Sequence, residues 1–396
     1  MTDAKLPARP LSLMLICGEP SGDQLGAELM AGLKSLEPSL VITGVGGAAM
    51  TAQGLHTLFA LDDTAVMGLR EVVPKIPVIL RRVREAADYA LATRPDAVVL
   101  IDSPDFTHRI ARRLKRIDPA IRTVNYVAPQ VWASRSYRAR AMARYFDLVL
   151  ALLPFEAPFF ESYGLKTVFV GHPVIERAAR MTGGDALRVR LGIGADTPLL
   201  AVLPGSRTNE VRLLLPVFRE TVALLAKQIP GLVCVLPVVP HVAGRVRDGT
   251  RDWPAPLHIV EGDADKFAAF DAADAALAAS GTVTTELALA KTPMAMAYKL
   301  GWLTWTLMRP FVDAPFGALV NIILQREAVP EFVQDKCTAQ GLAAALLSLF
   351  RDDAVRAKQI SDLEEAAAKL GEGGEAPSLR AARALLAFAR EARTKA

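Results

Sequence analysis

The chain has 396 residues, more than one hydrophobic core usually serves, so we expect about two domains. Hydrophobic residues make up 52% and charged residues 22% of the chain, which excludes a disordered or fibrous protein. The formal net charge of +4 is too small to indicate a nucleic-acid partner. Three cysteines far apart in the chain argue against a disulfide framework or a structural zinc and fit a reducing cytoplasm.

The apolar stretches are all shorter than the roughly 20 residues that a membrane-spanning helix needs. The first ten residues are polar and charged and do not resemble a secretory signal. We therefore expect a soluble or peripheral cytoplasmic protein.

From Leu11 onward, short apolar runs alternate with longer segments of helical spacing, which is typical of βα units around a parallel sheet. The first series of predicted strands covers residues 12–17, 40–43, 97–101, 121–126, 148–152 and 168–170. The second series covers residues 199–203, 232–236, 275–279 and 294–297. Two doubly wound, Rossmann-like α/β domains account for both series.

A segment rich in Arg, Gly and Asp separates the two series, and we place the domain boundary near residue 184. The first domain then covers 1–184 and the second covers 185–350. Residues 351–396 are rich in Ala, Leu and charges and are interrupted at 371–374, which predicts two amphipathic helices. We expect these helices to pack back on the first domain.

The first candidate for a functional loop is Gly-Glu-Pro-Ser-Gly-Asp at 18–23, between a predicted strand and a predicted helix. Glycines there let a ligand approach the backbone, and free N–H groups at a helix start attract anions. The pattern is not GxGxxG, and Glu19 would repel a pyrophosphate. A polar sugar-binding loop built from Glu19, Ser21 and Asp23 fits better. The alternative is a glycine-rich turn with Asp23 at the helix start.

Asp102 is the best candidate for a general base, because it follows the predicted strand 97–101 at the edge where open α/β sheets bind their ligands. The alternative is structural: Ser103 or Asp105 could cap the helix that begins near Phe106. Capping needs only one of the acids Asp102 and Asp105, so a cap by Asp105 leaves Asp102 free.

Two glycine loops in the second series suit a diphosphate. Their residues are Gly205, Ser206 and Arg207 after strand 199–203, and Ser280, Gly281 and Thr282 after strand 275–279. Backbone N–H groups, hydroxyls and a guanidinium could stabilise a departing diphosphate without a metal. Glu286, in the next helix, is a candidate for binding ribose hydroxyls. The alternative is that Glu286 is an ordinary solvated charge on the surface of that helix.

Metal and hydrolase sites have little support in the sequence. The five histidines share no i, i+4 pairing, and Asp263-Ala264-Asp265 is better interpreted as a helix start. Ser206 lacks the second glycine of a serine-hydrolase elbow. We therefore expect neither a metal nor a cofactor.

Two stretches, 66–84 and 302–309, mix large apolar residues with arginines and lysine. Exposed surfaces of this kind bind anionic bilayers. The alternative is that they are core helices with solvated basic faces.

Nine motifs in this order and spacing resemble the lipid-A-disaccharide synthase family over nearly the whole chain. They are GEPSGD at 18–23, GVGG at 44–47, VMG at 66–68, DSPDF at 102–106, YVAPQVW at 126–132, DLVLALLPFE at 147–156, GHP at 171–173, LPGSR at 203–207 and ASGT at 279–282. The family is one of inverting GT-B glycosyltransferases of lipid A biosynthesis in Gram-negative bacteria.

The resemblance implies a reaction between UDP-2,3-diacylglucosamine and 2,3-diacylglucosamine 1-phosphate, which gives a β-1,6-linked disaccharide 1-phosphate and UDP. It implies Asp102 as the base for the acceptor hydroxyl, with Glu19, Ser21, Asp23 and Met67 on the acceptor side. It implies that Arg207 contacts the diphosphate, that Glu286 contacts the nucleoside, and that Asn321 and Gln325 lie near the donor. The acyl chains imply association with the inner-membrane surface, and exchange of C-terminal helices in the family implies a homodimer.

The sequence departs from the family pattern at Ser134, where the family usually has Trp, and at Val320, where it usually has Pro. Two alternatives stay open at this point. A UDP-N-acetylglucosamine 2-epimerase would use the same architecture without a lipid surface. A non-catalytic nucleotide-sugar or lipid-binding protein would keep the loops and have no need of a base.

Overall fold

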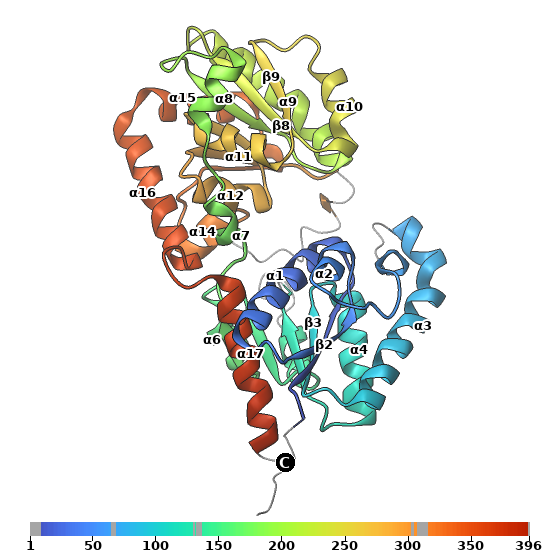
Figure 1. Cartoon of the computed structure of the whole chain (residues 1–396). Helices are drawn as coiled ribbons and strands as arrows, with labels where there is room; N and C mark the ends of the chain where they lie inside the picture. Colours follow the sequence, from blue (N-terminus) through green and yellow to red (C-terminus); the bar gives the residue numbers. More distant parts are fainter. Residues whose placement is uncertain are drawn as a thin grey trace, which may run out of the picture. The chain divides into compact units, whose positions relative to one another are not determined.

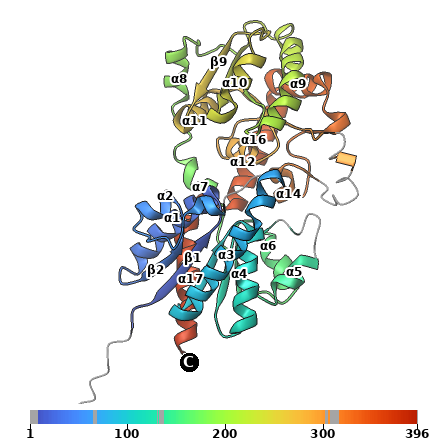
Figure 2. The same cartoon turned by 90° about the vertical axis from the view of Figure 1, so that its right-hand side faces the viewer.

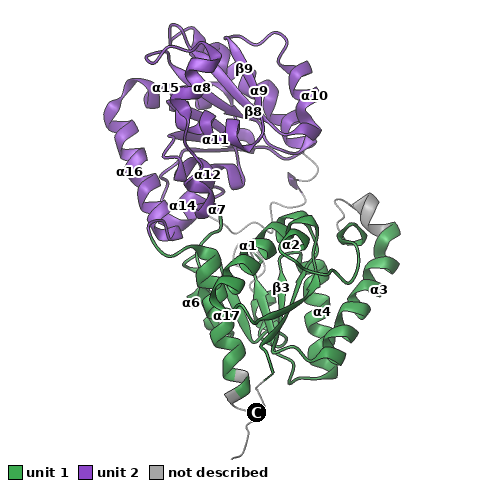
Figure 3. Cartoon of the chain, in the orientation of Figure 1, with its two compact units in different colours: residues 1–173, 374–396 green, residues 174–373 purple. Residues whose placement is uncertain are grey.

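The computed structural model describes residues 9–64, 69–129, 131, 137–301, 305–306 and 316–394. The chain forms two units, one from residues 1–173 with 374–396 and the other from 174–373 (Figure 3). Each unit is a parallel sheet of six strands flanked by helices, so the predicted α/β class with two doubly wound domains is confirmed. The first unit ends at Pro173, before the predicted boundary at 184, because α7 packs on α12 and α8 on α11 of the second unit.

The sheet of the first unit has the strand order β2-β1-β3-β4-β5-β6. Its strands are β1 (Ser12–Cys17), β2 (Val41–Val45), β3 (Ala97–Ile101), β4 (Thr123–Tyr126), β5 (Leu148–Ala151) and β6 (Thr167–Phe169). Its helices are α1 (Pro20–Leu36), α2 (Ala48–Ala52), η1 (Leu61–Asp63), α3 (Leu69–Thr93), α4 (Pro104–Ile117), α5 (Tyr137–Met142), α6 (Glu156–Glu161) and α17 (Pro377–Thr394).

Helices cover both faces of this sheet, so its central strands β1, β3, β4 and β5 are buried along nearly their whole length. All five residues of β3 are buried. Helices α3 and α4 pack on one face, where Met14, Val98 and Ile110 join one core (Figure 1). Helices α1 and α17 pack against each other on the opposite face.

The last helix, α17, returns the chain to the first unit. It packs closely on α1, where a Cβ on Gly32 would lie 3.0 Å from the carbonyl oxygen of Ser378. Two ion pairs fix its C-terminal half: Arg390 to Glu37 at 2.7 Å and Arg393 to the buried Asp96 at 2.7 Å. The expected packing of a C-terminal helix on the first unit is thus observed for α17, whereas α16 packs on α12, α14 and α15 of the second unit.

The sheet of the second unit has the order β12-β11-β10-β7-β8-β9. Its strands are β7 (Leu199–Leu203), β8 (Val233–Val238), β9 (Leu257–Glu261), β10 (Ala275–Ala279), β11 (Met294–Tyr298) and β12 (Glu331–Val333). Its helices are α7 (Val174–Ala178), α8 (Gly184–Leu191), α9 (Thr208–Ala226), α10 (Pro240–Gly249), α11 (Asp263–Ala272), α12 (Thr282–Leu289), α14 (Leu319–Leu324), η4 (Gln334–Lys336), α15 (Ala339–Arg351) and α16 (Asp353–Leu370). Helices α9, α10 and α15 share the core on one face, and α8 and α11 lie on the other (Figure 2).

In each sheet the strand order reverses once, between β1 and β3 in the first unit and between β7 and β10 in the second. Open α/β sheets bind ligands at this switch point, beyond the carboxyl ends of the strands. The loops at 18–23 and 102–103 flank the first switch point, and the loops at 204–207 and 280–281 flank the second. The fold therefore brings the four candidate loops together in two pairs.

None of the helices in the described ranges has the length and apolar character needed to cross a bilayer.

Candidate active site

Asp102 lies at the carboxyl end of β3 in an unusual backbone conformation. Asp102 (φ 52°) and Ser103 (φ 46°) are both left-handed, which non-glycine residues seldom adopt. The surrounding structure holds the turn: the Asp102 N–H donates to the Tyr126 carbonyl at 3.0 Å, and the Thr107 hydroxyl donates to the Asp102 carbonyl at 2.7 Å. Strained turns that the fold enforces in this way cluster at functional sites.

Ser21 meets Asp102 across the switch point. Its hydroxyl donates to Asp102 Oδ2 at 3.1 Å, and the Asp102 side chain is only half-buried. Glycines make this approach possible, because a Cβ on Gly18 would lie 2.8 Å from the Cβ of Ser103 and one on Gly22 2.9 Å from the Cβ of Cys17. The structure thus joins two of the residues predicted from separate motifs.

Asp23 has a different environment. Its carboxylate is buried, 6% exposed, and accepts hydrogen bonds from the N–H groups of Gly47, Ala49 and Met50 at 2.7 to 3.0 Å. It therefore caps α2 and fixes the turn after β2. Glu19 is the half-buried N-cap residue of α1. Met67 lies outside the described residues.

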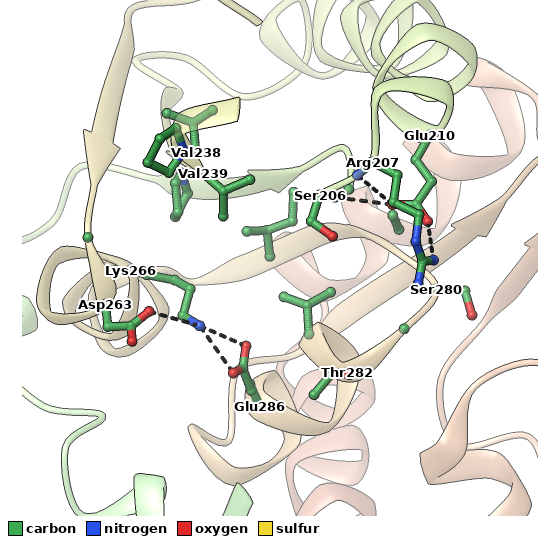
Figure 4. Close-up of a pocket in the computed structure, with 18 of the residues that line it drawn as sticks. Ser206, Arg207, Glu210, Val238, Val239, Asp263, Lys266, Ser280, Thr282 and Glu286 are labelled. Atoms are coloured by element: carbon green, nitrogen blue, oxygen red, sulfur yellow. Dashed lines mark hydrogen bonds and ion pairs between the residues drawn. The ribbon is translucent and has the colours of Figure 1, made fainter. Parts of the chain in front are cut away.

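The second unit contains a cavity of about 520 Å³ at its switch point (Figure 4). Seven of the nine residues predicted to bind UDP line it: Gly205, Ser206, Arg207, Ser280, Gly281, Thr282 and Glu286. These residues come from the two loops and from α12, so the sheet topology assembles the predicted group.

The first of these loops is held by Glu210. Its Oε2 accepts from the N–H groups of Ser206 at 3.1 Å and Arg207 at 3.2 Å, and its Oε1 pairs with the Arg207 guanidinium at 2.8 Å. Gly205 has φ +109°, and a Cβ there would lie 2.5 Å from Glu210 Oε2. The Arg207 side chain is 74% exposed, so its guanidinium is accessible to an anionic ligand.

The opposite wall is formed by a buried carboxylate with cations beside it. Glu286 is 5% exposed, and Lys266 Nζ lies 3.1 and 3.2 Å from its two oxygens (Figure 4). Arg177 Nη1 lies 3.9 Å from Oε1, and Asp263 lies 3.6 Å from Lys266. The interpretation of Glu286 as a solvated surface charge is therefore wrong.

Asn321 and Gln325 do not line this cavity. The Asn321 side chain is fully buried and engaged on both sides: it donates to the Val329 carbonyl and Glu331 Oε1 at 2.7 Å and accepts from the N–H groups of Ala328 and Val329. Gln325 is exposed, ends α14, and bonds back to the Ile322 carbonyl.

Sequence reasoning missed Lys266, Arg177 and the segment Val238–Pro240, all of which line the cavity. Lys266 follows Asp263-Ala264-Asp265, which does begin a helix, α11. The signal that could have found Lys266 was its place in the first turn of a helix after a strand, but that strand, β9, was itself not predicted. Within the described residues, no group of three or more His, Cys, Asp or Glu is arranged to hold a metal ion.

The chain has two doubly wound units, each with candidate ligand-binding loops at its switch point. This arrangement is typical of the GT-B class of fold, which occurs in nucleotide-sugar glycosyltransferases and epimerases. A putative UDP-N-acetylglucosamine 2-epimerase from Listeria monocytogenes has a similar structure, with a TM-score of 0.67, 15% identity and 98% of each chain covered. A glycosyltransferase from Rickettsia africae has a TM-score of 0.60 at 13% identity, covering 98% of this chain and 100% of that one. At these identities the likeness concerns the fold.

The sequence comparison is more specific. Residues 13–383 match the family described as Lipid-A-disaccharide synthetase. The lipid-A-disaccharide synthase of Rhodospirillum centenum is 47% identical over 379 residues, covering 96% of this chain and 94% of that protein. The chain belongs to the lipid-A-disaccharide synthetase family of glycosyltransferases, and the resemblance drawn from the nine motifs is confirmed.

Proposed function

We propose that this chain condenses UDP-2,3-diacylglucosamine with 2,3-diacylglucosamine 1-phosphate to give the β-1,6-linked disaccharide 1-phosphate and UDP. Family membership supports a transferase over both the epimerase and the non-catalytic binding protein. One observation carries the chemistry: both switch points hold functional groups. The first unit has the carboxylate of Asp102 there, and the second has a cavity of about 520 Å³ lined by the two glycine loops.

In this proposal Asp102 is the general base. Its carboxylate takes the proton of the acceptor 6-hydroxyl as that oxygen bonds to C1 of the donor sugar, while the C1–O bond to UDP breaks. Attack from the face opposite UDP inverts the configuration at C1. Ser21, which donates to Asp102 Oδ2 at 3.1 Å, orients the carboxylate. Glu19 lies at the same switch point and faces the acceptor, and Asp23 supports the loop by fixing the turn at Gly47.

The leaving diphosphate needs compensating charge. The loop residues Gly205 to Arg207 and Ser280 to Thr282 line the cavity and offer hydroxyls, N–H groups and an exposed guanidinium. Arg207 would exchange Glu210 for the diphosphate. Glu286, held by Lys266, would accept hydrogen bonds from the ribose hydroxyls. Asn321 and Gln325 would act indirectly, by fixing the backbone between α14 and β12. The reaction proposed here uses no metal and no cofactor.

Acyl chains on both substrates call for contact with the inner-membrane surface from the cytoplasmic side. Helix α3 supports this proposal: Ile76 is 44% and Leu80 40% exposed, one turn apart, with exposed Arg81 and Arg84 beside them. The other apolar residues of interest, at 65–68 and most of 302–309, lie outside the described residues. Ile76→Glu should reduce co-sedimentation with phosphatidylglycerol vesicles. Val355→Glu, at a residue 42% exposed on α16, is the matched control.

A homodimer is the remaining part of the proposal and rests on the family resemblance. Sedimentation equilibrium of the purified chain in detergent tests it, and a single species at 42.5 kDa would refute it.

The decisive test is an assay with EDTA, both acylated substrates and detergent. Disaccharide phosphate and UDP should form in equal amounts. Asp102→Asn should lower kcat by roughly 10²-fold to 10⁴-fold and leave UDP binding unchanged. Asp88→Asn, at an exposed position on α3, is the control.

Near-normal turnover of Asp102→Asn would refute the assignment of the base. Turnover of UDP-N-acetylglucosamine with no disaccharide would favour the epimerase. Binding of the substrates without any turnover would favour the non-catalytic protein.

A further inference from the structure

A second cavity, with a volume of about 200 Å³, lies in the first unit and is lined by residues of α4 and α5 together with Pro129, Val131 and Tyr145. Three arginines line it: Arg109 and Arg112 from α4 and Arg138 from α5. Asp105, in the first turn of α4, is the acidic residue among the described residues that line it. The described lining thus has an excess of positive charge, which favours an anionic ligand.

His108 adds a neutral donor to this cavity. The Arg112 guanidinium donates to the Tyr145 hydroxyl oxygen at 3.1 Å, and that hydroxyl lies 3.3 Å from His108 Nδ1. The oxygen accepts from Arg112, and we infer that its own proton is donated to Nδ1. Burial, together with the charges of Arg112 and Arg138, lowers the pKa of His108 to about 3, so the ring is neutral near pH 7. A neutral ring that accepts at Nδ1 carries its proton on Nε2.

The Nε2 atom has no hydrogen-bond partner among the residues that the structure describes, although His108 is only 7% exposed. Buried donors are nearly always paired, and an unpaired donor on a residue that lines a cationic cavity indicates an acceptor supplied from outside. The His108 ring is held in place by the protein, because it packs edge-on against the rings of Tyr145 and Phe146.

The place of the cavity suggests which anion it binds. Helix α4 has 14 residues and begins two residues after Asp102, so its dipole adds positive potential at the start of the helix. His108 lies four residues into the helix, about 6 Å along the axis. A phosphorylated hexosamine has a comparable length from its 6-hydroxyl to its phosphate.

We propose that this cavity binds the phosphate monoester of the acceptor, with His108 Nε2–H, Arg112 and Arg138 as donors. The inference rests on the proposed function, because it takes Asp102 as the base at the other end of the same sugar. The cavity would then discriminate a sugar 1-phosphate from an unphosphorylated sugar, and it would set which end of the acceptor faces the donor.

His108→Phe tests the proposal, since it keeps the aromatic packing and removes the Nε2 donor. With the phosphorylated acceptor, KM should rise roughly 10-fold while kcat and the KM for the UDP donor stay unchanged. With the unphosphorylated monosaccharide, His108→Phe and the unchanged chain should behave alike. Arg138→Ala, at an exposed position, is the second test variant in case His108→Phe folds poorly, and it should give the same pattern. Arg116→Ala, in the last turn of α4, is the matched control.

A second readout does not depend on turnover. Glucosamine 1-phosphate should bind the full chain in calorimetry, and His108→Phe should weaken that binding about 10-fold. If glucosamine 1-phosphate binds in this way but no disaccharide forms with the unchanged chain, the proposed function fails while the phosphate site stands. An equal loss for both acceptors, or no loss for either, overturns the site. If His108→Phe reduced co-sedimentation with phosphatidylglycerol vesicles but left the acceptor KM unchanged, the acceptor-phosphate site would also be overturned. The cavity would then be assigned to lipid headgroups.

Discussion

Replacing Asp23 tests whether its carboxylate supports the fold or contacts the substrate. Asp23→Ala would leave three N–H groups, those of Gly47, Ala49 and Met50, without their shared acceptor. Each hydrogen bond to a charged group contributes about 1.5 to 3 kcal/mol, and water can reach part of this turn. We therefore expect a loss of about 3 to 5 kcal/mol in the free energy of unfolding.

Urea denaturation followed by circular dichroism measures this loss. Ser21→Ala is the matched control two residues earlier, because its hydroxyl is exposed and bonds only to Asp102 in the described contacts. It should change stability by less than about 0.5 kcal/mol and lower kcat instead. If Asp23→Ala cost less than about 1 kcal/mol but abolished acceptor binding, the carboxylate would contact the substrate and the reasoning from its buried hydrogen bonds would be wrong.

Three further predictions concern other parts of the chain. Gly205→Ala should weaken UDP binding in calorimetry, because a Cβ would clash with Glu210 at a φ of +109°, whereas Gly244→Ala, with open space around it, should be tolerated; equal affinities would refute the argument. The pKa of His108 is lowered to about 3 in the folded chain, so on acidification the unfolded chain binds a proton at this residue first. The free energy of unfolding should therefore fall from about pH 6.5 toward pH 3, by up to about 1.4 kcal/mol per pH unit. In acid titrations of stability, His108→Phe should reduce this slope. The three cysteines are buried, and burial raises the pKa of each thiol, so Ellman's reagent should label them only after unfolding; rapid labelling of the native chain would contradict this.

The central strands of both sheets could be predicted from sequence because they are buried on both faces. The predicted strands 12–17, 97–101, 199–203 and 275–279 agree with β1, β3, β7 and β10 at every residue. The strands β9 and β12 were missed. Both lie at the edges of the second sheet, where a strand pairs on one side only, and both are largely half-buried and contain glutamate.

The candidate site was predictable where a residue directly follows a central strand, as Asp102 and Ser280 do, or lies in the short loop after one, as Ser206 does. It was not predictable where a side chain reaches the cavity from a neighbouring element. Lys266 meets Glu286 from α11, and nothing in the spacing of the two residues reveals the ion pair. The opposite error occurs at Asn321, whose polar side chain satisfies backbone groups in the interior instead of facing the cavity.

The position of α17 affects how the protein can be made. The helix that completes the first unit is encoded after the whole of the second unit. Domains usually fold in order as they leave the ribosome, but here the surface of α1 around Gly32 stays uncovered until residues 377–394 have emerged. The second unit can therefore finish folding before the first, and a chain released at residue 373 would present an unprotected apolar helix face to chaperones and proteases.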